Sequence, residues 1–503
     1  MIGTILFSSK IRYGRNKKNI SYYLFIPDDQ INYDKLIVAS KLGTSTKIDH
    51  YAKIEILDKD SNPPRGAIQT IFGPVNEIES CIKLSLHKYN IFPRQSINLS
   101  IKECVVERYD FRESNTFSID PEGSKDIDDA FHFEIIDDKL QLGIHITDLS
   151  DLEIEDKDIY SFVSKFSTFY FNNFADMKNL TLLEESICDE SNSLIQGQDR
   201  NCISLIINFD KEISYEFKKT KINNKNKITY EKADKLMLKN ESFKKFIIKL
   251  ETYWGKINDS HELIEKMMIF YNNKMAEYLF EKDIDFPIRV HQGINKDLHE
   301  KYIKCNHSVD SSLIKKICYH SAEYVNAKKY DNPFHYGLDI GLYSHATSPL
   351  RRVPDFVIQK IFTFHKQYDI CNFCKIFNDR LISFKSAYRD INKIKLIEEI
   401  KDRTEREFEA IVTNFSNERI IVYIPDLDII HPINFLRKIK DLIEIEVKDL
   451  TIKISHIESK DFITLDLLQK VKIKIMITPY EFNMNKKIRL YLLKPNLIDD
   501  IFE

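Results

Sequence analysis

Short alternating segments at both ends of the chain enclose a longer middle part in which strand and helix patterns are mixed. Near the start, stretches such as YYLFIP and YAKIEIL are separated by Asn, Asp, Gly and Pro, which is typical of strands joined by turns. This pattern predicts a small β-barrel over residues 1–96. From residue 409 onward, segments such as RIIVYIP and KVKIKIMI return to alternation and predict a second barrel.

The middle part contains both strand-like alternation and helical spacing of apolar residues. FHFEIID and KLQLGIHIT predict a hairpin that turns at Asp137 and Asp138. Apolar residues recur at helical spacing over 261–281 and 355–367. We therefore expect an α+β fold in three domains, which are a barrel over 1–96, a mixed central domain over 97–408 and a barrel over 409–503.

Composition narrows the class of protein. The 503 residues carry 74 Lys and Arg against 77 Asp and Glu, a formal charge of −3, which argues against a polycation that coats nucleic acid. No apolar run approaches the length of a membrane span, so we expect no membrane association, and the first residues do not follow the order of a secretory signal. Any nucleic-acid binding must use local basic surfaces.

Cysteine usage gives little chemistry. Of the eight cysteines, only Cys371 and Cys374 form a C-x-x-C pair. A structural zinc site usually needs four ligands, and no second pair has suitable spacing. This favours buried thiols in a reducing compartment over zinc, and we expect a cytoplasmic protein.

Basic and aromatic residues are interleaved near the N-terminus. Phosphate contact and base stacking by such residues hold single strands on OB-type surfaces, but a solvated loop between strands gives the same pattern, and the segment alone does not separate the two. The residues are Lys10, Arg12, Tyr13, Arg15, Lys17, Lys18, Tyr22 and Tyr23.

The strongest motif is SIDPEGSKDIDDAFHFEI, in which Asp120, Asp126, Asp128 and Asp129 fall within ten residues. Carboxylates this close repel one another, so they must be either solvated on a loop or neutralised by a cation. The apolar strand that follows favours a partly buried position. Oxygen ligands of this kind suit Mg²⁺ or Mn²⁺ acting on phosphates, and this reading is preferred to the solvated loop.

A second motif, YSHATSPLRRVPDF, places Arg351 and Arg352 at the start of an amphipathic segment. Arginines at a helix N-terminus beside hydroxyl groups make a phosphate clamp. Alone the motif is weak, because paired arginines on a helix are more often surface residues. Together with the acidic cluster it predicts phosphodiester hydrolysis that depends on metal.

These two motifs resemble the acidic motif and the later arginine motif of the ribonuclease II/R (RNB) exoribonucleases. The resemblance continues in order through LGIHITDLS, LIQGQDRNCISL, KITYEKAD, IEKMMIFYNNKMAEYLF and FPIRVHQG. SNPPRGAIQTIFGPVNE resembles the end of the cold-shock domain that precedes the catalytic domain in this family. The resemblance implies a central RNB catalytic domain flanked by OB-type RNA-binding barrels.

The activity that the resemblance implies is hydrolytic, processive 3′→5′ degradation of single-stranded RNA to nucleoside 5′-monophosphates. Asp120 and Asp129 would be the principal Mg²⁺ ligands and Asp126 a supporting one. Asp128 would be the carboxylate on which the chemical step most depends, and Arg351 would stabilise the scissile phosphate. We expect a monomer and infer no protein partner.

The resemblance also implies four residues that contact RNA: Tyr170, Tyr230, Glu265 and Glu398. Each has an ordinary structural alternative. The stretch FYF around Tyr170 is typical of core packing, Tyr230 could be a half-buried strand residue, and glutamates on helices are usually solvated.

The chain departs from the family pattern at Ala346, Gln359, Lys266 and Gln292. None of these positions is a proposed metal ligand, so we expect activity to be retained. The alternative hypothesis is a catalytically silent RNA-binding or regulatory protein with the RNB fold, and a nuclease that acts on DNA is a weaker third.

Overall fold

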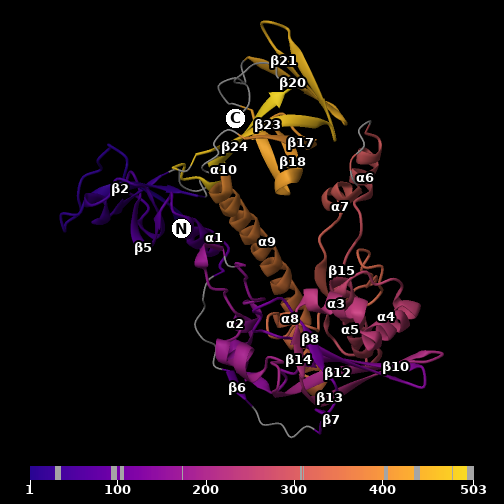
Figure 1. The fold of residues 1–503 in the computed structure, drawn as a ribbon. Coiled ribbons are helices and arrows are strands. Elements are labelled where there is room, and N and C mark those ends of the chain that lie inside the picture. Colours follow the sequence, from indigo (N-terminus) through magenta and orange to yellow (C-terminus); the bar gives the residue numbers. More distant parts are fainter. Residues whose placement is uncertain are drawn as a thin grey trace.

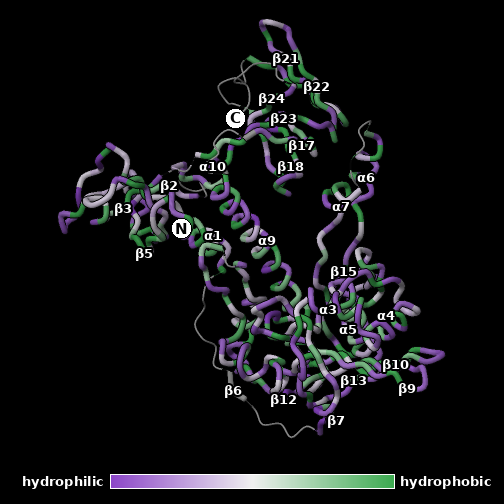
Figure 2. The backbone as a smooth tube through the Cα atoms, in the orientation of Figure 1, coloured by the Kyte–Doolittle hydropathy of each residue, from purple (hydrophilic) through white to green (hydrophobic). Residues whose placement is uncertain are grey.

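The computed structural model describes residues 1–28, 35–91, 99–101, 107–172, 174–305, 309, 311–400, 406–435, 442–478 and 480–495. The chain forms an N-terminal barrel, a mixed central body and a C-terminal group of strands, and the long helix α9 (Ile370–Ile400) runs from the central body toward the C-terminal strands (Figure 1). Figure 2 shows hydrophobic residues interspersed with hydrophilic ones in all three parts. Within the described ranges, no helix is long and apolar enough to span a membrane.

The N-terminal strands form a closed barrel, as the alternating segments predicted. Closure leaves no unpaired sheet edge. Ile5, Phe25, Val38 and Ile54 fill its interior. Tyr23 belongs to the same core, so the interpretation of this ring as part of an RNA-stacking surface is wrong. The strands, in the order β1-β2-β3-β5-β4 around the barrel, are β1 (Ile2–Leu6), β2 (Tyr22–Pro27), β3 (Leu36–Ala39), β5 (Arg65–Pro74) and β4 (His50–Asp58).

Helix α1 (Ile78–Lys88) connects the barrel to the central body by packing against α9. The guanidinium of Arg380 on α9 donates to the carbonyl oxygens of Tyr89 (3.0 Å) and Asn90 (3.1 Å). Tyr51 in the barrel donates its hydroxyl to the carbonyl of Phe482 (2.9 Å) near the C-terminus. The predicted boundary at residue 96 lies outside the described residues.

The centre of the molecule is a seven-stranded sheet. The hairpin predicted at Asp137 and Asp138 is confirmed, and both residues have positive φ, as a two-residue turn of this type requires. The strands, in sheet order, are β14 (Asn226–Ile228), β8 (Phe117–Ile119), β9 (Asp129–Ile136), β10 (Lys139–Thr147), β12 (Asp199–Phe209), β13 (Ile213–Asn223) and β7 (Tyr109–Phe111).

Helices pack on this sheet through one large apolar core. The helices predicted over 261–281 and 355–367 are confirmed as α5 and α8. The main helices are α3 (Tyr230–Lys239), α4 (Glu241–Trp254), α5 (Ser260–Glu281) and α8 (Val353–Phe364). Smaller elements are α2 (Ile159–Val163), α6 (Lys296–Ile303), α7 (Ser311–Cys318) and the strand pairs β6 (Leu99–Ile101) with β11 (Leu152–Ile154) and β15 (Pro287–Val290) with β16 (Glu323–Asn326).

The C-terminal strands share one core. Five of them form a curled sheet, β19-β18-β17-β23-β24, whose outer strands β19 and β24 contact each other, as in an OB-type barrel. The predicted boundary at 408/409 falls inside β17. The strands are β17 (Arg406–Phe415), β18 (Arg419–Ile424), β19 (Ile429–Asn434), β23 (Lys470–Ile477) and β24 (Ile488–Lys494), with a second sheet of β20 (Ile443–Val447), β21 (Thr451–His456) and β22 (Phe462–Asp466) and the short helix α10 (Met484–Lys487).

Candidate active site

The acidic motif forms the loop between the neighbouring strands β8 and β9. Asp120 directly follows β8, and its backbone N–H donates to the carbonyl of Ile228 (3.1 Å). Asp129 is the first residue of β9. Between them, Ile127 is fully buried and its N–H donates to Ser193 Oγ (2.9 Å). The anchored loop therefore brings both of its end carboxylates to one place, and the partly buried position expected for the cluster is confirmed.

Asp120 and Asp129 carry charge that nothing around them fully neutralises. Burial raises the pKa of Asp120, and burial together with repulsion from Asp120 and Asp128 raises the pKa of Asp129 well above its usual range. Asp120 Oδ2 is buried and has no hydrogen-bond partner. A buried carboxylate oxygen without a hydrogen-bond partner, in a side chain whose charge acts on a second carboxylate, fits a hard divalent cation. In the part of the chain that the structure describes, no three His, Cys, Asp or Glu side chains are already arranged around a metal position.

Asp128 is buried and holds the arginine motif. Its Oδ1 accepts a hydrogen bond from the backbone N–H of Leu350 (3.0 Å), and its Oδ2 accepts one from Arg351 Nε (3.1 Å). Burial raises the pKa of Asp128 to about 7, although Arg351 acts in the opposite direction. The two strongest motifs in the sequence therefore meet through this one carboxylate.

The guanidinium of Arg351 is fixed but accessible. Its Nη2 donates to Ser348 Oγ (2.9 Å), and the side chain remains 42% exposed. A second buried carboxylate, Asp355 in the first turn of α8, accepts from the N–H of Ser348 (2.8 Å) and from Arg352 Nη2 (2.8 Å). The loop before α8 is thus held at both ends, and Arg351 contacts the acidic loop through Asp128. Its predicted role at the scissile phosphate stays a prediction.

Tyr170 lies beside the acidic loop. Its hydroxyl donates to Asp126 Oδ2 (2.5 Å), and its backbone N–H donates to the hydroxyl of Tyr388 on α9 (3.0 Å). Burial, followed by the charge of Asp126, raises the pKa of the Tyr170 hydroxyl. The neighbouring Thr168 donates its N–H to the carbonyl of Arg351 (2.9 Å). The structure therefore places Tyr170 at the site.

Tyr230 also lies at the site, but it is not a strand residue. It is the first residue of α3, which Thr229 caps. Burial, followed by the charges of Asp129 and Asp120, raises the pKa of Tyr230. Its ring stacks on that of His261, with ring centroids 3.8 Å apart and planes 3° from parallel.

The two glutamates are placed differently from these tyrosines. Glu265 is exposed on α5, one turn beyond His261. Glu398 lies near the end of α9, ten residues after Tyr388, which corresponds to about 15 Å along a helix. The contact of these two glutamates with RNA stays a prediction.

The four departures from the family pattern have structural partners. Gln359 is buried and bridges the end of β10, accepting from the N–H of Leu149 (2.9 Å) and donating to the carbonyl of Thr147 (2.7 Å). Ala346 is buried and donates its N–H to Asn272 Oδ1 (2.8 Å). The ammonium group of Lys266 donates to the carbonyl oxygens of Trp254 (2.8 Å) and Lys256 (2.9 Å). The side-chain amide of Gln292 donates to the carboxylate of Glu323 (3.2 Å). These substitutions are compatible with the described site.

Sequence reasoning missed several residues that position the site. Asp355, Tyr388 and His261 were not singled out. Asp355 follows a proline at the start of a predicted helix, which is a signal for an acidic first-turn residue. Tyr388 and His261 carry no such signal, because their roles depend on contacts between segments far apart in the chain.

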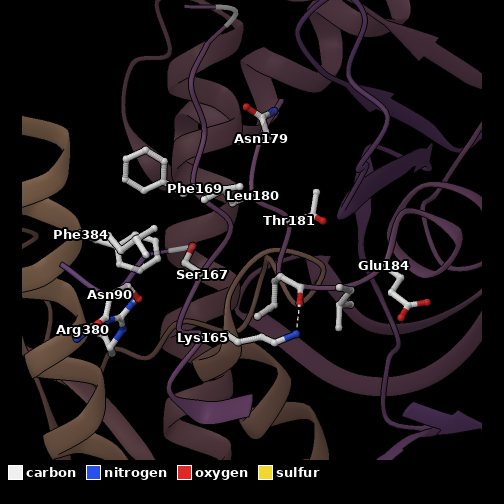
Figure 3. A pocket seen from close by; sticks show the side chains of 13 residues that line it. Asn90, Lys165, Ser167, Phe169, Asn179, Leu180, Thr181, Glu184, Arg380 and Phe384 are labelled. Carbon is white, nitrogen blue, oxygen red and sulfur yellow. Dashed lines mark hydrogen bonds between the residues drawn. The ribbon is translucent and has the colours of Figure 1, made fainter. Parts of the chain in front are cut away.

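A cavity of about 290 Å³ lies next to the segment that carries Tyr170 (Figure 3). Ser167 and Phe169 line it from that segment, and Phe384 lines it from α9. Lys165 donates to the carbonyl of Leu182 (3.5 Å) within it. None of the four aspartates lines this cavity, so it is separate from the acidic site.

Tyr170→Phe should lower the free energy of unfolding by about 1.5–3 kcal/mol, because it leaves the Asp126 carboxylate without a charge-assisted hydrogen bond. Urea unfolding of both proteins measures this difference. The exposed Tyr336 provides the control, since Tyr336→Phe should change stability by less than about 0.5 kcal/mol. Equal effects of the two substitutions would contradict the assigned hydrogen bond.

Lys360 on α8 is a buried ammonium that donates to the carbonyl of Ser150 (2.7 Å). Burial lowers its pKa to about 8, although Glu153, Asp151 and Asp148 act in the opposite direction. Its usual pKa is about 10.4. At pH 7 Lys360 is protonated in both states, and holding this charge in the buried site lowers the stability of the folded state.

This Lys360 pKa predicts a stability that rises with pH. Between the folded pKa of about 8 and the unfolded value, the unfolded chain binds more protons, so unfolding becomes harder as pH increases. From pH 7.5 to 9.5, wild type should gain about 1–2 kcal/mol relative to Lys360→Met in urea unfolding. Lys17→Met, at the exposed Lys17 in the N-terminal barrel, should track wild type. A constant difference between wild type and Lys360→Met would refute the assignment.

The sequence is similar to those of two named ribonucleases. The chain is 21% identical over 505 residues to ribonuclease R of Thermotoga maritima, covering 80% of the chain and 70% of that protein. It is 23% identical over 423 residues to ribonuclease R of Aquifex aeolicus, covering 67% of the chain but only 59% of that protein.

Solved structures show the same fold. Ribonuclease R of Mycoplasma genitalium, in complex with ribose-methylated single-stranded RNA, superimposes with a TM-score of 0.76 at 16% identity, covering 98% of this chain and 90% of that one. Yeast Ssd1, described as a pseudonuclease, superimposes with a TM-score of 0.68 at 15% identity, covering 98% and 82%. The RNB domain model matches residues 108–252 and 244–365, just over half of the chain. The chain therefore belongs to the RNB domain family.

Proposed function

We propose that this chain is a hydrolytic, processive 3′→5′ exoribonuclease that degrades single-stranded RNA to nucleoside 5′-monophosphates with Mg²⁺ or Mn²⁺. One observation carries the proposal. The buried Asp128 joins the acidic loop to Arg351, beside two carboxylates whose charge is not neutralised. Family membership and the RNA-bound relative support RNA as the substrate.

Each side chain has a distinct part in the proposed reaction. Asp120 and Asp129 would hold the cation, which when bound neutralises phosphate charge and makes its bound water a better nucleophile. Asp128 positions Arg351, whose partly exposed guanidinium can bind the scissile phosphate as negative charge develops on it. Tyr170 keeps the Asp126 carboxylate in place. The ring of Tyr230, backed by His261, offers a flat surface beside the carboxylates for the terminal base.

A catalytically silent RNA-binding protein is the competing function, and the similarity to a pseudonuclease shows that this fold alone does not decide between them. The site favours the enzyme. Two neighbouring carboxylates with raised pKa values lower the stability of the folded protein when no cation is bound. Binding of RNA alone does not require these two carboxylates.

The test uses 5′-labelled single-stranded RNA, purified full-length chain and Mg²⁺, with EDTA in a parallel reaction. We expect products that shorten from the 3′ end, 5′-monophosphates as the released species, and no shortening in EDTA. An excess of unlabelled RNA added after the start tests processivity, because a processive enzyme finishes the strand it holds. RNA that is bound but never shortened with either Mg²⁺ or Mn²⁺ would falsify the proposal. A DNA strand of the same sequence tests sugar preference.

A further inference from the structure

The C-x-x-C pair lies in the first turn of α9, away from the acidic site. Cys371 is the second residue of the helix and is exposed, whereas Cys374 is buried one turn later. The expectation that both thiols are buried is therefore wrong for Cys371. Both thiols are free.

The exposed thiol opens into a groove of about 370 Å³ between α9 and β16. Asn326 on β16 donates its Nδ2 to Cys371 Sγ (3.7 Å), which fixes the direction of the sulfur. Lys329 and Lys375 line the same groove, together with the single carboxylate of Asp379. The two lysines outnumber the one carboxylate, so the groove favours a small molecule that carries carboxylate groups.

The geometry of the pair suits a disulfide better than a metal. Side chains three residues apart on a helix have Cβ atoms roughly 5–6 Å apart, and a disulfide needs roughly 3.5–4.5 Å. Closing the bond therefore requires the first turn of α9 to move against the hydrogen bonds by which Asp369 holds the N–H groups of Asn372 (3.1 Å) and Phe373 (3.0 Å). Among the described residues, no group of three His, Cys, Asp or Glu is placed to hold a metal, so the two thiols lack the further protein ligands of a structural zinc site.

We propose that Cys371 and Cys374 form a redox-active dithiol that reacts with anionic low-molecular-weight disulfides. The Cys371 thiolate attacks one sulfur of the small disulfide, breaks its S–S bond and releases one small thiolate. Cys374 then loses its proton and attacks Cys371 Sγ, which closes the protein disulfide and releases the second thiolate. The two protein thiols lose two electrons, and the small disulfide gains them to give two thiols.

The difference between the two thiols supports this order of attack. Burial, followed by the proximity of Cys371, raises the pKa of Cys374 to about 12. A buried, protonated thiol reacts slowly with a solute, but it can react with a sulfur one helical turn away. The exposed Cys371 is therefore the first nucleophile and Cys374 the second.

Contacts connect this dithiol to the arginine motif. One turn beyond Cys374, Asn378 accepts from the N–H of Tyr324 (2.8 Å) and donates to its carbonyl (2.9 Å). The Tyr324 hydroxyl is hydrogen-bonded to His345 Nδ1 (2.6 Å), in the loop that leads to Arg351. A shift of the first turn of α9 on disulfide closure would reach the active-site loop through these bonds.

The test treats reduced full-length protein with glutathione disulfide, blocks the remaining thiols by alkylation and maps the modified residues by mass spectrometry. Wild type should form the Cys371–Cys374 disulfide without a lasting adduct, and Cys374→Ser should keep glutathione on Cys371. Cys305→Ser, at a partly buried thiol elsewhere, should react as wild type does. If Cys371 stays open to alkylation while other thiols are modified, the proposal is wrong. Tight zinc binding that requires both thiols would also overturn it.

The charge of the groove is tested separately. The Lys329→Gln/Lys375→Gln variant should react about 3- to 10-fold more slowly with glutathione disulfide, but not with the cationic disulfide cystamine. Equal slowing with both reagents would contradict an anionic ligand.

The coupling to the active site rests on the proposed nuclease function. RNA shortening by oxidised wild type should fall about 2- to 10-fold, recover with dithiothreitol, and be unaffected by the same treatment in Cys371→Ser. An unchanged rate in oxidised wild type would refute the coupling. The mass measurements need no catalysis, so a chain that cleaves no RNA still tests the dithiol.

Discussion

An Asp128→Asn variant is expected to bind single-stranded RNA but to shorten it about 10³-fold more slowly than wild type. The substitution keeps the size of the side chain and one oxygen, which can still accept the Leu350 N–H. The new amide N–H₂ then faces Arg351 Nε, which is also a donor, so the hydrogen bond that positions the guanidinium is lost. Single-turnover RNA shortening in Mg²⁺ measures the rate.

Binding in EDTA separates this loss from misfolding. Phosphate contacts and stacking dominate single-strand affinity, so the affinity of Asp128→Asn should stay within about threefold of wild type. Asp137→Asn is the matched control, because Asp137 is exposed in the β9–β10 turn at a positive φ that asparagine adopts equally well. Asp137→Asn should retain full activity. Rapid RNA shortening by Asp128→Asn would remove Asp128 from the proposed chemistry.

The acidic and arginine motifs could be predicted from the sequence because each is a short local run with few chemical explanations. The alternation of apolar and polar residues likewise predicts the barrel strands, and the helical spacing of apolar residues predicts helices α5 and α8. The position of Asp128 between the motifs could not be derived from either motif alone, since 222 residues separate it from Leu350. Long-range pairing of this kind depends on the whole sheet and the helices packed on it.

Burial was the property that local pattern predicted least well. Tyr23 follows a basic stretch that ends at Lys18 but belongs to the barrel core, because the alternation of a strand does not say which face is inside. Cys371 and Cys374 look equivalent in sequence, yet the helix exposes one and buries the other. The family resemblance predicts that Glu398 contacts RNA, and in the structure this residue lies near the C-terminal end of α9.

The centre of the sheet contains a buried hydrogen-bonded network of two histidines and a serine. One glycine leaves the room that a histidine ring of this network occupies. His132 Nδ1 and His145 Nε2 are 2.7 Å apart, and His145 Nδ1 is 2.7 Å from Ser204 Oγ. Burial lowers the pKa of His132 to about 4 and that of His145 well below its usual range, so both rings are neutral at pH 7. Gly143 on β10 lies directly opposite His132 on β9, and the imidazole occupies the space of the missing side chain.

Gly143→Ala should therefore lower the free energy of unfolding by about 3–5 kcal/mol, from overpacking and from loss of a buried hydrogen bond. A Cβ at Gly143 would lie 2.1 Å from His132 Cε1 and 3.0 Å from His145 Nε2. β10 is paired on both sides, so its backbone cannot move away without breaking a ladder. Urea unfolding of wild type and variant at pH 7 measures the change.

Gly341→Ala is the control for the general effect of adding a methyl group, since a Cβ there would meet no heavy atom within 4 Å. It should change stability by less than about 0.5 kcal/mol. A double-mutant cycle then identifies the clash as the cause. If the imidazole is what the new methyl group strikes, Gly143→Ala in a His132→Ala background should cost about 1–3 kcal/mol less than in wild type, because the two sites are coupled through direct contact. Additive effects would place the strain of Gly143→Ala in the backbone of β10 instead of in the histidine pair.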